Sequence, residues 1–113
     1  MYLRDGKAHF VYNLLALDRF TTTSEPLPKG KVSLVAEVAY EGKPGELGKG
    51  ATVTLSANGQ KVGTGTLPRT VPIQFSLSEG MDIGTDLGSA VDFTYELPFS
   101  FTGKVEKVTI DLK

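Results

Sequence analysis

Three aspartates in the glycine-rich stretch GMDIGTDLGSAVDF, residues 80–93, are the side chains whose spacing most suggests chemistry. Asp82, Asp86 and Asp92 carry hard carboxylate oxygens, which are the ligands that calcium takes on protein loops. Their order is not that of an EF-hand, and the glutamate that closes such a loop is missing. Tight turns also select aspartate and glycine, for backbone reasons alone. We therefore interpret the stretch as turns without metal and keep a calcium site as the alternative.

The glycines of this stretch do not match a phosphate-binding motif. A dinucleotide fingerprint needs the order G-x-G-x-x-G between a strand and a helix, whereas Gly80, Gly84 and Gly88 stand four apart and no helical stripe follows them. A P-loop needs Gly-Lys followed by Ser or Thr, which the sequence lacks. The sequence therefore predicts no nucleotide-phosphate site here.

Candidate acid–base groups are scattered along the chain. His9 is the only histidine, and no serine or cysteine nucleophile pattern accompanies it. Glycosidases need two carboxyl groups that face each other across a cleft. The spacing of the carboxylates does not predict that they converge; the candidates are Asp18, Glu37, Glu41 and Glu46. We interpret them as solvated charges and His9 as a sheet-surface residue, with a metal ligand or general base as the alternative for His9.

Two further groups of residues could recognise a partner. Weak candidates for binding an anion are Lys43, Lys49 and Arg69, because their charges suit sulfate or carboxylate groups. The segment DFTYELPFSF concentrates four aromatic side chains, those of Phe93, Tyr95, Phe99 and Phe101. We expect these rings to fill a core. The alternative is a partly exposed apolar patch that docks on another domain or protein.

Length and composition limit the class of protein. The chain has 113 residues, a length that suits one domain whose core needs no stabilising metal or disulfide. Its formal net charge is −1. No Lys/Arg cluster favours nucleic acid, and no apolar run approaches the ~20 residues that cross a bilayer. The N-terminus lacks the apolar stretch of a signal peptide. The absence of cysteine excludes disulfides but leaves the compartment, periplasmic or cytoplasmic, open.

The elements that position these residues are predicted to be short strands. Apolar and polar residues alternate over 32–40, 51–57 and 71–77, with the period of a half-buried strand. Thirteen glycines and six prolines disfavour helix. Asn58-Gly59 suits a type I′ turn, so we expect an antiparallel hairpin that joins 51–57 to 60–67.

Both ends of the chain predict further strands. The motif DGK at 5–7 indicates a turn after a first short strand. In the final stretch FTGKVEKVTIDL the apolar residues change parity between Val105 and Val108. We expect a β-bulge near Glu106-Lys107, which would return them to one face; a strand buried on both faces is the alternative. Because strands must bury their apolar faces and no helix is predicted, we expect a single all-β domain over 1–113, an antiparallel two-sheet β-sandwich with little or no helix.

Four stretches occur in order along the chain: DGKAHFVYNLLALDRFTTTS, LPKGKVSLVAEVAYEG, GKGATVTLSANGQKVGTGTLPRTVPIQFSLSEGMDIGTDLGS and PFSFTGKVEKVTIDL. Together they resemble the C-terminal domain of large bacterial arylsulfatases. The hairpin turn at Asn58-Gly59, the segment Ile83-Gly84 and the strand from Phe101 to Val108 are also similar to elements of concanavalin A-like, laminin-G-type sandwiches. The resemblance implies a jelly-roll arrangement of the strands.

The resemblance implies a function without chemistry in this chain. Sulfatases hydrolyse sulfate esters with a formylglycine, made from the Cys or Ser of C/S-x-P-x-R, beside a calcium ion. This chain has no cysteine, and Arg69 directly follows Pro68, which is the wrong spacing for that motif. The resemblance implies a non-catalytic accessory domain without a cofactor of its own, excised from a longer sulfatase whose calcium- and formylglycine-dependent catalytic domain would precede Met1.

Two functions follow from these expectations. The accessory domain would pack on the catalytic domain of the same polypeptide or on a partner subunit, and would shape substrate access. The partner subunit could be a second copy of the chain, which is self-association. The alternative is a lectin-like module that recognises neutral or sulfated glycans. Its candidate contacts are the loops at 41–50 and 80–92, together with the basic residues named above.

Overall fold

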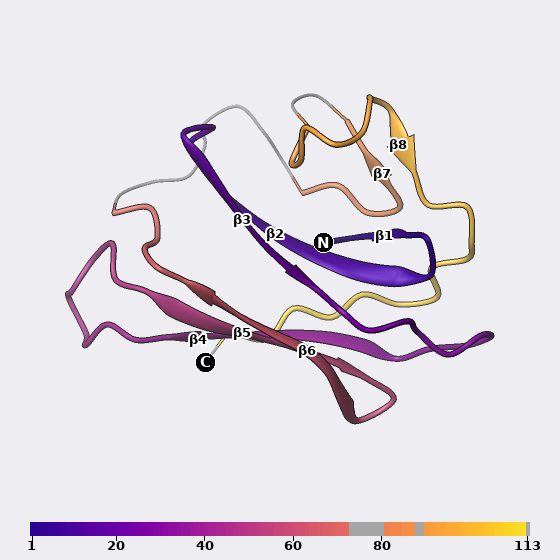
Figure 1. Cartoon of the computed structure of the whole chain (residues 1–113), viewed down its shortest axis with the longest axis horizontal. Helices are drawn as coiled ribbons and strands as arrows, with labels where there is room; N and C mark the ends of the chain where they lie inside the picture. Colours follow the sequence, from indigo (N-terminus) through magenta and orange to yellow (C-terminus); the bar gives the residue numbers. More distant parts are fainter. Residues whose placement is uncertain (73–80, 88–89, 113) are drawn as a thin grey trace. The chain divides into compact units, whose positions relative to one another are not determined.

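The computed structural model describes residues 1–72, 81–87 and 90–112 (Figure 1). Two compact units make up the chain, Met1–Ser78 and Glu79–Lys113. The described residues of the first unit form two antiparallel sheets of three strands each, and those of the second form a two-stranded antiparallel sheet. The described residues contain no helix, which confirms the predicted all-β class. None of them therefore lies in a helix that could span a membrane.

The first sheet is a meander of β1 (Tyr2–Arg4), β2 (Lys7–Leu14) and β3 (Asp18–Thr23). Asp5 and Gly6 connect β1 to β2 with φ angles of 53° and 71°, which confirms the turn that the DGK motif predicts. A short polar residue followed by glycine suits this turn, because both can adopt positive φ.

The second sheet is a meander of β4 (Leu34–Tyr40), β5 (Ala51–Ala57) and β6 (Gln60–Leu67). Asn58 and Gly59 join β5 to β6 with φ angles of 50° and 82°. The predicted hairpin is confirmed, with the predicted bounds of both strands. The Asn58 side chain also accepts a hydrogen bond from the Ser33 N–H at 2.9 Å, so the turn is tied to the residue before β4.

The pairing of β5 with β6 contains an irregularity that the sequence analysis missed. Leu55 pairs with Gly63 while Ser56 pairs with Lys61, so Val62 is the extra residue of a bulge. The Val62 side chain packs against the buried core, and its carbonyl accepts a hydrogen bond from the Glu25 N–H at 2.7 Å. The bulge therefore links β6 to the chain that leaves β3.

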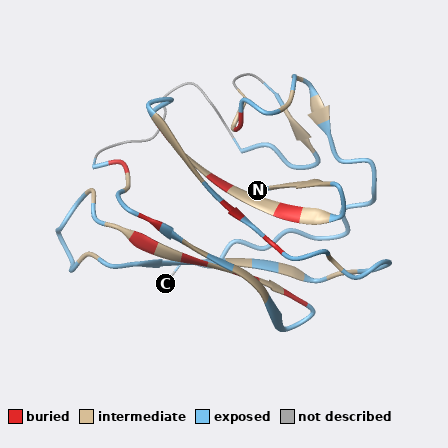
Figure 2. Cartoon of the chain, viewed as in Figure 1, coloured by how far each residue is buried: buried red, intermediate tan, exposed pale blue. Residues whose placement is uncertain are grey.

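The core of the first unit lies between its two sheets. Leu55, Leu67 and Val53 are fully buried on β5 and β6. The rings of Phe10 and Phe20, from β2 and β3, pack against them. In Figure 2 most of the buried residues of this unit lie on β2, β3, β5 and β6, whereas β4 carries none. Burying a large aliphatic side chain contributes about 1.5–3 kcal/mol, so this cluster is a main source of stability.

Each sheet in the described part of the chain is built from strands that follow one another in the sequence. A jelly roll instead alternates strands between two sheets. The jelly-roll order expected from the resemblance is therefore not seen among the described strands. A complete two-sheet sandwich stays a prediction, as does the strand expected at 71–77, of which residues 73–77 lie outside the described residues.

The second unit contains β7 (Thr85–Asp86) paired with β8 (Phe99–Ser100). Gly84 precedes β7 with a φ angle of 83°, and its carbonyl accepts a hydrogen bond from the Phe101 N–H at 2.8 Å. Positive φ at this position suits glycine, which has no Cβ atom.

The strand and bulge predicted at the C-terminus are wrong. Residues 101–112 form no strand, so there is no ladder in which Glu106-Lys107 could be a bulge. Val108 is 50% exposed and Leu112 is 91% exposed. Alternating apolar residues favour a strand, but a strand also requires a hydrogen-bonded neighbour, and sequence pattern alone does not supply one.

Candidate functional site

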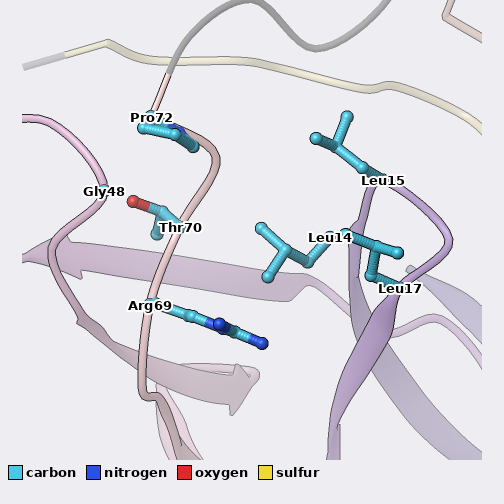
Figure 3. Close-up of a pocket in the computed structure, with 7 residues that line it drawn as sticks. All are labelled: Leu14, Leu15, Leu17, Gly48, Arg69, Thr70 and Pro72. Carbon is cyan, nitrogen blue, oxygen red and sulfur yellow. The ribbon is translucent and has the colours of Figure 1, made fainter.

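The first unit contains a pocket of about 360 Å³ between the β2–β3 turn and the segment that follows β6 (Figure 3). Three leucines form one side of it, and Arg69 and Thr70 face them. Figure 3 shows the Leu14 side chain pointing towards this segment and the Arg69 side chain extending back towards the turn. The lining residues are Leu14, Leu15, Leu17, Gly48, Arg69, Thr70 and Pro72.

The leucine side of the pocket is the turn between β2 and β3, and its backbone is unusual. Leu15 and Ala16 have φ angles of 52° and 61°, in the left-handed region that residues with a side chain rarely adopt. Two hydrogen bonds hold the turn: Leu17 N–H to the Leu14 carbonyl at 2.9 Å and Ala16 N–H to Asn13 Oδ1 at 2.8 Å. Left-handed residues other than glycine cost of order 1–3 kcal/mol each and occur preferentially at functional sites.

The same turn presents apolar side chains to solvent. Leu17 is 78% exposed and Leu15 is 48% exposed, whereas Leu14 is buried. Hairpin turns of this type normally carry asparagine, aspartate or glycine. A turn made of leucine and alanine is therefore both strained and apolar, which is the opposite of what folding alone selects.

The opposite side of the pocket is anchored by two hydrogen bonds to distant residues. The Val71 N–H donates to the Tyr12 hydroxyl at 2.9 Å, and the Thr70 hydroxyl donates to the Lys49 carbonyl at 2.8 Å. These bonds hold the segment after β6 against both β2 and the loop before β5. They also place Arg69 at the mouth of the pocket.

Arg69 is the charged group of this site. Its guanidinium donates a hydrogen bond to Asp18, the first residue of β3, and forms an ion pair with it. The two side chains remain 59% and 43% exposed, so solvent screens the pair and it contributes little to stability. A guanidinium has five donors, so Arg69 can bind a second anion beside Asp18.

Of the three predicted basic residues, only Arg69 lines this pocket, and Lys49 is tied to it through its backbone. Thr70, next to Arg69, is bonded to Lys49, which follows the pocket residue Gly48. Lys43 is not one of the lining residues. Its N–H donates to Glu46 Oε2 at 2.9 Å in the turn at 43–46.

The three aspartates of the opening stretch act as acceptors for backbone N–H groups. Asp82 accepts from Leu87 at 2.9 Å, and Asp92 accepts from Thr94 at 3.2 Å. Asp86 accepts from Val91 at 3.2 Å. These are the local bonds that the turn interpretation predicts. Within residues 1–72, 81–87 and 90–112, no three His, Asp or Glu side chains gather as metal ligands.

The aromatic segment divides into half-buried and exposed rings. Tyr95 and Phe99 are half-buried and stacked, with ring centroids 4.2 Å apart. Phe93 is 73% exposed, and Phe101 is 37% exposed. Tyr95 and Phe99 fit the expectation that the rings fill a core. Phe93 and Phe101 fit the alternative of an exposed apolar surface.

The pKa of the Tyr95 phenol is raised above its ordinary value. Burial is the main cause, because it disfavours the charged phenolate. The Tyr95 hydroxyl also donates a hydrogen bond to Asp86, and the negative charge of that carboxylate raises the pKa further. Tyr95 therefore stays protonated and serves as a hydrogen-bond donor within the second unit.

Two of the scattered acid–base candidates, His9 and Glu41, have separate partners in the structure. His9 stacks on Tyr2 with ring centroids 4.8 Å apart, and its Nδ1 lies 3.1 Å from the Thr23 hydroxyl, which is the expected surface position on a strand. Glu41 accepts a hydrogen bond from the Thr52 hydroxyl at 3.3 Å. Neither His9 nor Glu41 is among the residues that line the pocket.

Protein-family models, curated proteins and solved structures were compared with the chain, and none matches. The resemblance to arylsulfatase C-terminal domains therefore stays a prediction. The residues that sequence reasoning missed are Leu15 and Leu17. The sequence LLAL at residues 14–17 could have revealed them, because the turn between two antiparallel strands normally carries polar residues or glycine.

Proposed function

We propose that this chain is a non-catalytic accessory domain of an arylsulfatase, a sulfuric ester hydrolase, which docks on a catalytic domain or partner subunit and shapes substrate access. The sulfatase part of the proposal rests on the resemblance of the four sequence stretches. The observation that supports docking is the β2–β3 turn, which exposes two leucines on a strained backbone. Exposed apolar groups of this kind gain free energy when a partner removes them from water.

The pocket beside this turn supports recognition more than bond cleavage. Its lining residues include one cation and one hydroxyl, those of Arg69 and Thr70, among apolar side chains. A hydrolase of the sulfatase type needs an activated nucleophile and a metal, which the resemblance assigns to another domain. In the proposed role, the leucines contact an apolar surface and Arg69 pairs with an acidic group at its rim.

The proposal is tested with the purified chain and with the catalytic domain of the same polypeptide. The chain alone should release no phenol from aryl sulfate esters above the buffer rate. Adding it to a catalytic domain that lacks it should form a complex and change the KM for bulky aryl sulfates. Sulfate release by the chain alone, or the absence of any complex, would refute the proposal.

A second candidate function is the lectin-like module. The observation that favours it is the exposed Arg69 guanidinium in the lining of an open pocket, because a guanidinium suits the sulfate group of a sulfated sugar. Titration calorimetry with sulfated and neutral oligosaccharides tests it. Binding should weaken at high salt and in Arg69→Gln; a flat titration with every sulfated sugar would remove this candidate.

A further inference from the structure

The outer edge of β4 is unpaired within the described chain. Among the described strands, β4 is the terminal strand of its sheet and pairs with β5 alone. All seven of its residues are half-buried or exposed. An edge of this kind presents unused backbone donors and acceptors to solvent, and proteins usually protect it with charges, proline or a covering element.

The hydrogen bonds at the two ends of β4 show which residues face outward. Ser33 accepts from Asn58 at 2.8 Å, and the Glu41 N–H donates to Gly50 at 2.9 Å. In an antiparallel ladder, bonded and non-bonded pairs alternate. The odd-numbered residues of β4 therefore bond to β5. The even-numbered residues direct both N–H and carbonyl groups away from it; these are Leu34, Ala36, Val38 and Tyr40.

The same even-numbered residues place their side chains on the core side of the sheet. Ala36 pairs with Leu55 and Val38 pairs with Val53, and both partners are fully buried. Val38 itself is 46% exposed. A strand added beside β4 would satisfy the outward backbone groups and would also cover the Val38 side chain. Only an extended backbone matches donors and acceptors that repeat at alternate residues of a strand.

We propose that the outer edge of β4 binds an extended segment of a partner protein as an added strand, with a basic residue opposite Glu37 and apolar residues on either side of it. Glu37 is the only charged side chain of β4 and lies on the face opposite Ala36 and Val38. A lysine or arginine across from it forms a favourable cross-strand pair. The flanking apolar residues would extend the core beside Val38.

A second copy of this chain fits the edge poorly. Glu37 is the central residue of the seven-residue strand, so full antiparallel pairing of two β4 strands would place Glu37 directly opposite Glu37. Like charges in that position are destabilising. The β4 edge contains none of the pocket residues, and its proposed role does not depend on the proposed sulfatase function.

The test uses the full chain, labelled with ¹⁵N, and a peptide of about nine residues that alternates threonine and valine around a central lysine. Binding is followed by fluorescence anisotropy of the peptide and by amide exchange of the protein. We expect saturable binding with slowed exchange at the outward amides of Ala36 and Val38. A matched peptide with glutamate at its centre should bind about fivefold more weakly.

Two protein variants separate the backbone contribution from the charge. Ala36→Pro removes an N–H that points away from β5, a position where an edge strand tolerates proline, and should weaken binding at least about tenfold. Glu37→Lys should reverse the preference, so that the glutamate peptide binds more tightly than the lysine peptide. If Ala36→Pro does not fold, the Glu37→Lys reversal still decides the matter.

Three outcomes would overturn the proposal. The first is no change in the exchange of the outward amides with either peptide. The second is equal affinity for the lysine and glutamate peptides. The third is a concentration-dependent dimer that protects Ala36 and Val38 without peptide, which would make a second copy the occupant.

Discussion

Thr22 of β3 lies directly against Gly65 of β6: a Cβ atom at position 65 would overlap the Thr22 hydroxyl. Gly63, two residues earlier, meets the neighbouring backbone in the same way, with an added Cβ 3.0 Å from the Thr23 carbonyl oxygen. The two sheets of the first unit therefore approach each other along a line of glycines. This close approach lets Phe20 of β3 reach the core cluster on β5 and β6.

Gly65→Ala should destabilise the first unit by about 1–3 kcal/mol, because the added methyl group overpacks the contact with Thr22. Urea unfolding followed by circular dichroism measures the change. Thr66→Ala, at an exposed position of β6, is the matched control and should shift stability by less than about 0.5 kcal/mol. Combining Gly65→Ala with Thr22→Ala should recover part of the loss, since residues in contact are not additive. Full additivity would contradict the proposed contact.

Leu15→Gly should stabilise the chain by up to about 1 kcal/mol, because Leu15 has a φ angle of 52° that costs a residue with a side chain about 1–2 kcal/mol. Glycine offsets part of this gain through its more flexible unfolded state. The free energy of unfolding is the measurement. Leu17→Ser, at the neighbouring exposed position, should leave stability nearly unchanged.

The same two variants separate strain from docking. If the apolar turn serves recognition, both should weaken the complex with the catalytic domain, although only Leu15→Gly raises stability. A loss of stability in Leu15→Gly would show that the left-handed backbone is not strained. Unchanged complex formation by both would remove the turn from the docking surface.

Tyr95 should make the stability of the second unit fall at alkaline pH. The pKa of Tyr95 is raised in the folded chain by burial and by Asp86, relative to about 10 in the unfolded chain. The folded state thus holds the phenolic proton more tightly, so this contribution is complete below pH ~10 and is lost as pH rises towards the folded pKa. Urea unfolding between pH 8 and 11 measures the fall, and Tyr95→Phe should make it shallower. An equally steep fall in Tyr95→Phe would contradict the assignment.

Val108→Ser should change stability by less than about 0.5 kcal/mol, because Val108 is 50% exposed in a segment that forms no strand. The same change in a buried strand would cost well over 1 kcal/mol. Val53→Ser, at a fully buried position of β5, is the control that should show this larger loss. Equal losses in the two variants would restore the predicted C-terminal strand.

Arg69→Gln should leave the free energy of unfolding within about 0.5 kcal/mol of the parent, because its ion pair with Asp18 is exposed to solvent. It should nevertheless abolish the binding of any anionic partner to the pocket, which calorimetry measures. Arg69→Lys is the matched control and should keep part of the affinity, since lysine retains the charge without the guanidinium donors. Unchanged anion binding in Arg69→Gln would exclude Arg69 as the recognition group.

Short-range features of this protein were determined by the sequence alone. Asn58-Gly59 predicts the hairpin of β5 and β6 to the residue, and the DGK motif predicts the turn between β1 and β2. Both depend on positive φ at neighbouring residues, a property of the residues themselves. The all-β class follows in the same way from the alternation of apolar side chains and the many glycines.

Tertiary structure decided everything that requires two distant segments to meet. The alternating residues at 101–112 have the pattern of a strand, but a strand exists only where a neighbour completes its hydrogen bonds. Similarly, Arg69 is an ordinary loop residue in the sequence and becomes part of a pocket only because Val71 and Thr70 are bonded to Tyr12 and Lys49. Backbone preference is local, whereas hydrogen bonding and burial between sheets depend on the path of the whole chain.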